Sequence, residues 1–224
     1  MDFLNAEEIL RSCRSDGVLL RADRPLATLD AALRLGFDAP SGRGELLWGT
    51  FSQIGPLRWS YLLSVSTTQP LTVQLDEMGA AAGERFLLWD VWRDPNATSP
   101  QEVAAGAGFV VPQSPATTEK TVDTGSYQVL APILASGWSF LEARKTVPAS
   151  RRRFGDVTST SDGFSVSVRG AARETVQVLA LYKGAEATGG WRVVEVSCRG
   201  GECSGLDCDV EMRLTCAAAG CTCS

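Results

Sequence analysis

Histidine is absent from all 224 residues. Its absence excludes Ser-His-Asp and Cys-His nucleophile pairs, histidine general bases and every zinc site with a histidine ligand. Catalytic chemistry in this chain would therefore have to come from carboxylates, tyrosine, lysine or cysteine. The sequence also lacks any apolar run approaching the ~20 residues that cross a bilayer, so we expect no membrane partner.

A secretion signal is likewise missing from the first residues, "MDFLNAEEILRSCRSDG", which contain neither a basic n-region nor a continuous apolar stretch. If Met1 is the true start, we expect a cytoplasmic chain. Asn96-Ala97-Thr98 is a glycosylation tripeptide, which a cytosolic chain never uses. The sequence leaves the compartment open.

Positive charge is scarce, since 21 Lys and Arg stand against 26 Asp and Glu, for a net charge of −5. This balance argues against nucleic acid as a partner, because phosphate binding needs a positive field. Arg151-Arg152-Arg153 is a local exception. Such a run either holds a phosphate or sugar acid or forms a solvated or interdomain face, and the acidic background favours the second interpretation.

Two-residue periodicity dominates from Glu45 onward. Apolar and polar residues alternate at 71–76, 164–169 and 209–214, and "RFLLWDVW" (85–92) has the continuous apolar character of a strand buried on both faces. Further strands are expected at 45–51, 59–66, 108–111, 175–183 and 191–197. Short strands with regular turn punctuation predict an all-β fold, an antiparallel sandwich over residues 45–224. Residues 2–13 are expected to form a short helix, and loops with short structured pieces follow it.

The stretch "YQVLAPILASGWSFLEARKTVPASRRRF" (127–154) predicts a buried hairpin of two strands joined at Ser136-Gly137. Gly137 would permit the turn and Trp138 would fill the core. Pro148 would end the second strand, because proline cannot donate to a sheet ladder.

Six of the seven cysteines lie in the last 27 residues, and three interpretations remain open for them. A thiolate metal site is one, although the paired C-x2-C spacing typical of zinc is missing. Disulfides between the last strands and the tail are the second, in an oxidising compartment. Inert buried thiols are the third. The cysteines concerned are Cys198, Cys203, Cys208, Cys216, Cys221 and Cys223.

Tryptophans and carboxylates supply two further candidate sites. Exposed tryptophans could stack on sugar rings, but most of the six lie in apolar strand runs and are expected in the core. Pairs of carboxylates could act as the two catalytic acids of a glycosidase, but no supporting pattern surrounds them. The tryptophans are Trp48, Trp59, Trp89, Trp92, Trp138 and Trp191, and the carboxylate pairs are Asp90/Asp94 and Asp76/Glu84.

Two stretches resemble the raffinose-synthase and α-galactosidase-like group of glycoside hydrolase family 36, and the likeness covers about two-thirds of the chain. "SDGVLLRADRPLATLDAAL" (15–33) is similar to the segment that leaves the catalytic barrel of that group, with a pattern close to D-G-x-L-L-R-x-D-R-P. Residues 127–154 resemble its C-terminal β-domain, with L-x-P-x-L-x-x-G-W-x-x-L-x-E followed by V-P-x-S-x-R-R-F. Ala143-Arg144-Lys145 departs from the acidic residues often found there, and the cysteine-rich tail lies outside the likeness.

The resemblance implies a division of the chain and a supporting role. Residues 1–44 would be a remnant of the last barrel helix and exit loop, and residues 45–224 the C-terminal sandwich. The catalytic aspartates of the group lie on barrel strands N-terminal to everything here, so we expect a non-catalytic accessory domain, a fragment whose parent is a glycosidase or glycosyltransferase. No catalytic residue, metal or cofactor is expected. The partners would be the upstream barrel and α-galactosides.

Two other functions remain open. One is a free-standing carbohydrate-binding module that uses surface tryptophans. The other is a structural or interaction protein whose tail is held by disulfides.

Overall fold

The computed structural model describes residues 11–32, 46–65, 67, 69–90, 100–104, 106–112, 126–183, 191–202 and 209–224. Within these ranges the chain is nearly all β with antiparallel sheets, which confirms the predicted fold class. No helix in this part of the chain is long and apolar enough to cross a membrane. The chain divides into two compact units, which are described separately.

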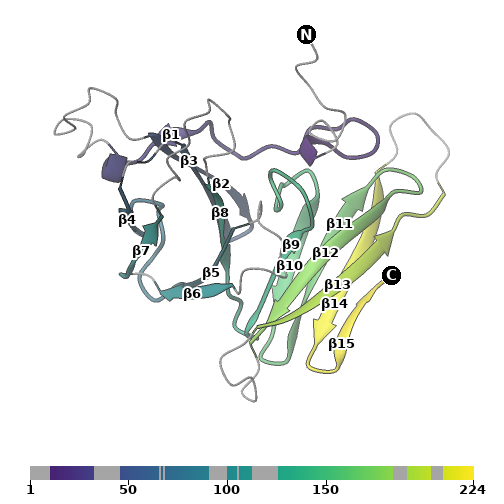
Figure 1. Ribbon diagram of the computed structural model, residues 1–224. Coiled ribbons are helices and arrows are strands. Elements are labelled where there is room, and N and C mark those ends of the chain that lie inside the picture. The colour runs from purple at the N-terminus through teal and green to yellow at the C-terminus, as the bar shows by residue number, and fades with distance from the viewer. Residues whose placement is uncertain are drawn as a thin grey trace, which may run out of the picture. The chain divides into compact units, whose positions relative to one another are not determined.

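The first β-unit consists of Arg24–Phe51 and Arg58–Pro132. Its larger sheet has six strands in the order β1 (Ala27–Thr28), β2 (Leu46–Ile54), β3 (Leu57–Val65), β8 (Ser126–Pro132), β5 (Arg85–Asp90) and β6 (Gln101–Ala104). A second sheet pairs β4 (Leu71–Gln74) with β7 (Gly108–Val111) (Figure 1).

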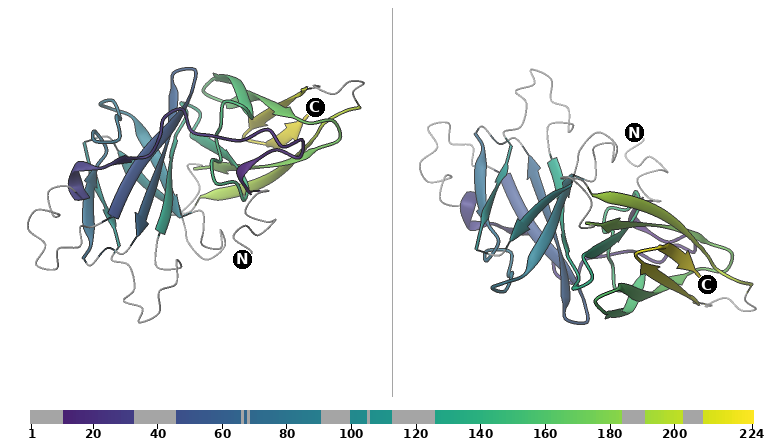
Figure 2. Two further views of the ribbon diagram at one scale, coloured as in Figure 1. Left: turned by 90° about the horizontal axis from the view of Figure 1, so that it is seen from above. Right: turned by 90° about the horizontal axis from the view of Figure 1, so that it is seen from below.

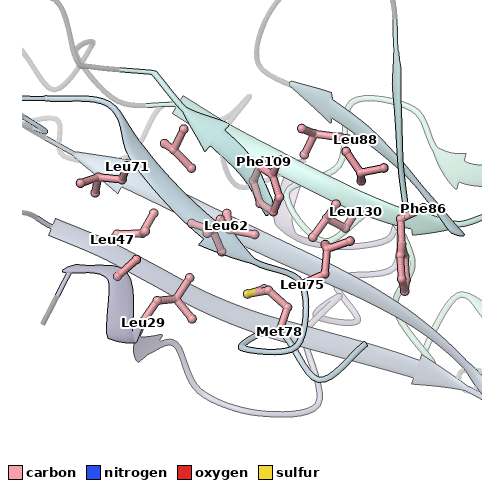
Figure 3. Packing of buried hydrophobic residues seen from close by; sticks show 14 of the residues in the cluster. Leu29, Leu47, Leu62, Leu71, Leu75, Met78, Phe86, Leu88, Phe109 and Leu130 are labelled. Atoms are coloured by element: carbon pink, nitrogen blue, oxygen red, sulfur yellow. The ribbon is translucent and has the colours of Figure 1, made fainter. Parts of the chain in front are cut away.

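One apolar cluster joins the two sheets of the first β-unit (Figure 3). Alternation places Leu71 and Val73 of β4 in this cluster, while Thr72 between them is exposed, as the period of two predicts. In β5 all four residues from Phe86 to Trp89 are buried, which confirms the prediction of a strand covered on both faces.

The C-terminal sandwich consists of Met1–Asp23, Ser52–Leu57 and Ile133–Ser224. One sheet has the order β10 (Phe154–Ser159), β11 (Gly163–Gly170), β14 (Val210–Ala217) and β15 (Gly220–Cys223). The other has the order β13 (Arg192–Arg199), β12 (Thr175–Tyr182) and β9 (Trp138–Glu142). The yellow hairpin of β14 and β15 ends at the C-terminus (Figures 1 and 2).

Aromatic rings from both sheets form the core of the C-terminal sandwich. The ring of Phe140 in β9 lies 5.2 Å from those of Phe154 in β10 and Phe164 in β11. Trp138 is 1% exposed and stacks on Tyr182 at 4.7 Å. These offset and edge contacts are the arrangements that aromatic pairs prefer. Trp138 therefore fills the core, as its apolar surroundings in the sequence predict.

The predicted hairpin of residues 127–154 is wrong, although the turn in it exists. Gly137 has φ +79°, and its amide donates to Leu134 O at 2.9 Å. However, β8 lies between β3 and β5 in the six-stranded sheet, whereas β9 pairs with β12. Both strands are buried throughout. Because both faces of each strand are buried, the pattern of either strand does not identify its partner, and the sequence could not distinguish a hairpin from two strands in different sheets.

The second strand of that stretch also ends earlier than predicted. It stops at Glu142, and Pro148 lies beyond it in a turn region. The amide of Glu142 donates to Pro148 O at 2.7 Å, so the proline contributes its carbonyl group.

The compact units do not coincide with a boundary between residues 44 and 45. Leu29, Ala31 and Ala32 pack in the core of the first β-unit, together with the early strands. Residues 45–224 supply strands to both units. The barrel origin of residues 1–44 stays a prediction. Of the helix expected at 2–13, Arg11 and Ser12 are helical, and residues 1–10 lie outside the described residues.

Candidate functional site

A buried ionic cluster lies in the C-terminal sandwich, with the guanidinium of Arg153 at its centre. Nε of Arg153 donates to Oε2 of Glu142 at 2.9 Å. Its NH1 and NH2 groups donate to the two carboxylate oxygens of Glu174 at 3.0 and 2.8 Å. NH1 also donates to the carbonyl of Arg169 at 2.6 Å. The three side chains are 0%, 3% and 8% exposed, so the charges are neutralised by one another rather than by solvent.

Three short segments place these side chains. Glu142 is the last residue of β9, so it projects from the end of a strand. Arg153 closes a turn in which its amide donates to Ser150 O at 2.9 Å, immediately before β10. Glu174 ends the tight turn from Ala171, whose third residue, Arg173, has the left-handed φ of +61°. Turns at fixed strand ends hold the two carboxylates on either side of one guanidinium.

The two carboxylates differ in their electrostatics. Burial opposes ionisation of Glu174, but hydrogen bonds from Arg153 and from the amides of Ala171 and Ser15 lower its pKa to about 2. Burial raises the pKa of Glu142, because desolvation of its charge outweighs the attraction of Arg153 and Lys145. Glu174 therefore holds its negative charge more firmly than Glu142 does.

The segment Arg11–Asp23 attaches to this cluster and to the neighbouring turn. The amide of Ser15 donates to Oε1 of Glu174 at 3.1 Å. Lys145 Nζ donates to Cys13 O at 2.7 Å, and Ser150 Oγ donates to Arg21 O at 3.1 Å. At the end of the segment, Asp23 forms an ion pair with Arg151 at 2.7 Å. The segment is thus fastened to the sandwich along its length.

An open pocket of about 500 Å³ lies beside the segment, lined by charged residues that already have partners. Arg14 binds Asp16 and Asp209, each at 2.6 Å, and Arg173 binds Glu202 at 2.8 Å. Lys145 and Glu174 make the contacts given above. A ligand would have to break these ion pairs, so the pocket is a poor candidate for a charged ligand.

Cysteines of the tail are joined in two disulfides in the structure. Cys198 of β13 bonds to Cys223 of β15, and Cys216 of β14 bonds to Cys221 of β15. The first of these connects the two sheets of the C-terminal sandwich. Cys203 and Cys208 lie outside the described residues, and the buried Cys13 forms no disulfide with the cysteines that the structure describes. No group of three or more Cys, Asp or Glu in the described ranges is arranged to hold a metal ion.

Candidate carboxylate pairs from the sequence serve local turns. Asp76 accepts a hydrogen bond from the amide of Glu77 at 2.9 Å, and Glu84 accepts one from the amide of Ala81 at 2.6 Å. Asp90 is half-buried at the end of β5. Asp94 and the tripeptide at Asn96 lie outside the described residues.

Tryptophans occupy mainly interior positions among the residues described. Trp59, Trp89 and Trp138 are buried, and Trp48 and Trp191 are half-buried. Trp92 lies outside the described residues. The expectation that most tryptophans lie in the core agrees with the three buried rings.

Sequence reasoning missed the ionic cluster. The run Arg151-Arg152-Arg153 is divided, because Arg151 and Arg152 are exposed while Arg153 is wholly buried. The expectation of a solvated face is therefore wrong for Arg153. One signal was available: Glu142 ends the apolar run "WSFL", where a carboxylate needs a partner if the run is buried.

Comparisons with models of protein families, with curated proteins and with solved structures found no match to this chain.

Proposed function

We propose that this chain is the non-catalytic C-terminal β-domain of an α-galactosidase- or raffinose-synthase-like enzyme. The observation that carries the proposal is the contact between the two stretches that resemble that group. Arg21 and Asp23, from the stretch 15–33, contact Ser150 and Arg151, from the stretch 127–154. A segment that leaves a barrel and then binds the following sandwich would fix the two domains to each other.

A supporting role agrees with the chemistry of the cluster. Arg153 and two backbone amides hold the Glu174 carboxylate, and burial in the sandwich encloses Glu142. A glycosidase needs one carboxylate that gives up a proton and one that faces the sugar ring. Carboxylates that are buried in an internal ion cluster can neither give up a proton to a substrate nor face a sugar ring. The cluster therefore has a structural role, because its ion pairs and hydrogen bonds connect β9, the turn before β10 and the segment Arg11–Asp23.

The alternative of a free-standing carbohydrate-binding module based on surface tryptophans has less support. Stacking on a sugar needs an exposed ring face, and Trp59, Trp89 and Trp138 are buried. Trp48 and Trp191 keep partial exposure. Titration with galactosides tests this alternative, because saturable quenching of tryptophan fluorescence requires a ring at the binding site.

The size of the endogenous protein tests the proposal most directly. An antibody against residues 155–224 should detect a band of about 50 kDa or larger, because a complete barrel adds ~250 residues. A band at 23.9 kDa, the mass of this chain, would overturn the proposal. The isolated chain should also fail to hydrolyse p-nitrophenyl α-galactoside. Hydrolysis that a single Asp or Glu substitution abolishes would contradict the non-catalytic role.

A further inference from the structure

A second pocket, of about 300 Å³, lies at an irregularity of β10 in the C-terminal sandwich. The register of β10 against β11 shifts between Phe154 and Val157, so Gly155 and Asp156 bulge from the ladder. Both line the pocket, together with Arg169 of β11 and Arg151. We name this hollow the bulge pocket. Its volume lies at the lower end of the range for small-molecule sites.

Gly155 makes the close packing of this pocket possible. A Cβ atom at that position would lie 2.4 Å from Ser167 Oγ and 3.1 Å from NH2 of Arg169. The guanidinium of Arg169 therefore passes over a residue without a side chain and donates to Arg151 O at 3.3 Å. Ser167 is 1% exposed, and its hydroxyl group has no hydrogen-bond partner among the described residues. A buried unpaired hydroxyl group beneath a hollow is unusual in a native fold.

The positive and negative charges at the bulge pocket are nearly balanced, and two of the charged side chains can still form hydrogen bonds to a ligand. Arg151 is paired with Asp23. Asp156 is exposed and makes no hydrogen bond or ion pair to the described residues, and Arg169 uses NH1 for one backbone carbonyl. The pocket thus offers one free carboxylate and one guanidinium with spare donors. An anion would be attracted by Arg169 and Arg151 but repelled by Asp156, and a cation would meet the reverse, so the pocket has no strong preference for either sign of charge.

A row of hydroxyl groups continues from the pocket across the same sheet. Thr158 of β10 is directly opposite Ser165 of β11, which is opposite Thr215 of β14, which is opposite Thr222 of β15. Three of these residues are exposed and Ser165 is half-buried, whereas Val166 and Leu214, the next pair along the ladder, are buried. The surface beside the pocket is therefore rich in groups that both donate and accept hydrogen bonds, and the exposed Arg213 adds one positive charge, since its NH1 group donates to Ser165 Oγ at 3.2 Å.

We propose that the bulge pocket binds a neutral polyhydroxyl compound, a monosaccharide or the terminal unit of a short oligosaccharide. A carboxylate accepts from two hydroxyl groups, and a guanidinium donates in a fork to two neighbouring oxygens. The hydroxyl row, together with Arg213, would contact further units by exchanging hydrogen bonds. The site uses none of the tryptophans, and it adjoins the ionic cluster at Arg169, whose carbonyl group accepts from Arg153 at 2.6 Å while its guanidinium lines the pocket. It goes beyond the supporting role and does not depend on it.

The test is a titration of the ¹⁵N-labelled chain, followed through its amide resonances. Galactose and raffinose should produce saturable shifts centred on Gly155, Asp156 and Val157. Asp156→Asn and Arg169→Gln should each weaken binding about tenfold or more, since each removes a charge-assisted hydrogen-bonding group. Asp162→Asn and Arg152→Gln alter exposed residues of the same types outside the pocket and should leave the affinity unchanged.

Other probes separate the competing ligand classes. Alanine presents a carboxylate and an ammonium group, and inorganic phosphate presents an anion alone. Stronger responses at Gly155–Val157 to either compound than to the sugars would overturn the proposal. Sugar-induced shifts elsewhere, or no saturable shift at millimolar concentrations, would also overturn it. The band size of the endogenous protein is independent of all these outcomes, so failure of this site and failure of the supporting role can be told apart.

Discussion

Nε of Arg153 lies 2.9 Å from Oε2 of Glu142, and the two side chains are 0% and 3% exposed. They come from the turn before β10 and from the end of β9, which belong to different sheets of the C-terminal sandwich. A buried charge is tolerated only when its partner and its hydrogen bonds are in place. The end of β9 and the start of β10 therefore have to be correctly placed together, because each charge is stable in the interior only beside the other.

Removing the cation should destabilise the fold severely. Arg153→Met leaves Glu142 without its guanidinium partner, and we expect a loss of about 3–5 kcal/mol in the free energy of unfolding. Urea denaturation measures this loss. Arg152→Met is the matched control, since Arg152 is exposed, and its effect should stay within about 0.5 kcal/mol. Equal effects of the two variants would contradict the structural role of Arg153.

Glu174 should make stability dependent on pH in the acid range. Its pKa is lowered to about 2 in the fold, below its value in the unfolded chain. The carboxylate therefore stabilises the fold fully above about pH 5, and this contribution is lost as the pH falls towards 2. The raised pKa of Glu142 acts in the opposite direction, because the fold then binds that proton more readily than the unfolded chain does.

Glu174→Gln should consequently flatten the dependence of unfolding free energy on pH between about 5 and 2. Denaturation curves at a series of pH values provide the measurement. Glu202→Gln is the matched control because the Glu202 side chain is 82% exposed, and it should leave the profile unchanged. An unaltered acid slope in the Glu174 variant would show that the carboxylate is not held as described.

The disulfide between Cys198 and Cys223 should stabilise the sandwich more than the one between Cys216 and Cys221. The cysteines are 25 residues apart in the first case and 5 in the second. Loop-closure entropy then predicts losses of about 3.5 and about 2 kcal/mol when each pair is replaced by serine. Urea denaturation without reductant measures both. If reductant leaves the wild-type transition unchanged, the disulfides do not hold the tail.

Gly137 should resist replacement because of its backbone conformation. Its φ of +79° is strained for a residue with a Cβ atom, although the space there allows an ordinary contact with Lys183 O at 3.4 Å. Gly137→Ala is expected to cost about 1–2 kcal/mol in unfolding free energy. Gly201→Ala is the control, since a Cβ there meets nothing within 4 Å. A neutral Gly137 variant would show that the turn can adopt another conformation.

Strand positions could be predicted from the sequence because alternation is a local property. The pattern at 164–169 and 209–214 identified which residues of β11 and β14 face the core, and those residues are buried apart from Val210, which is half-buried. The partners of β8 and β9 could not be predicted, since each strand is buried on both faces and shows no alternation. The bulge at Gly155 could not be predicted either, because residues 154–157 are equally compatible with a regular strand.

The sequence alone determined the all-β class, most strand positions and the exclusion of histidine chemistry, since composition and two-residue periodicity belong to single segments. Tertiary structure alone decided that Arg153 is buried while Arg151 and Arg152 are exposed, and that Glu142 is its partner. The physical reason is that the cost of desolvating a charge is offset only when a second, distant segment supplies the opposite charge. Periodicity describes one strand, whereas pairing and burial depend on the free energy of the whole sheet.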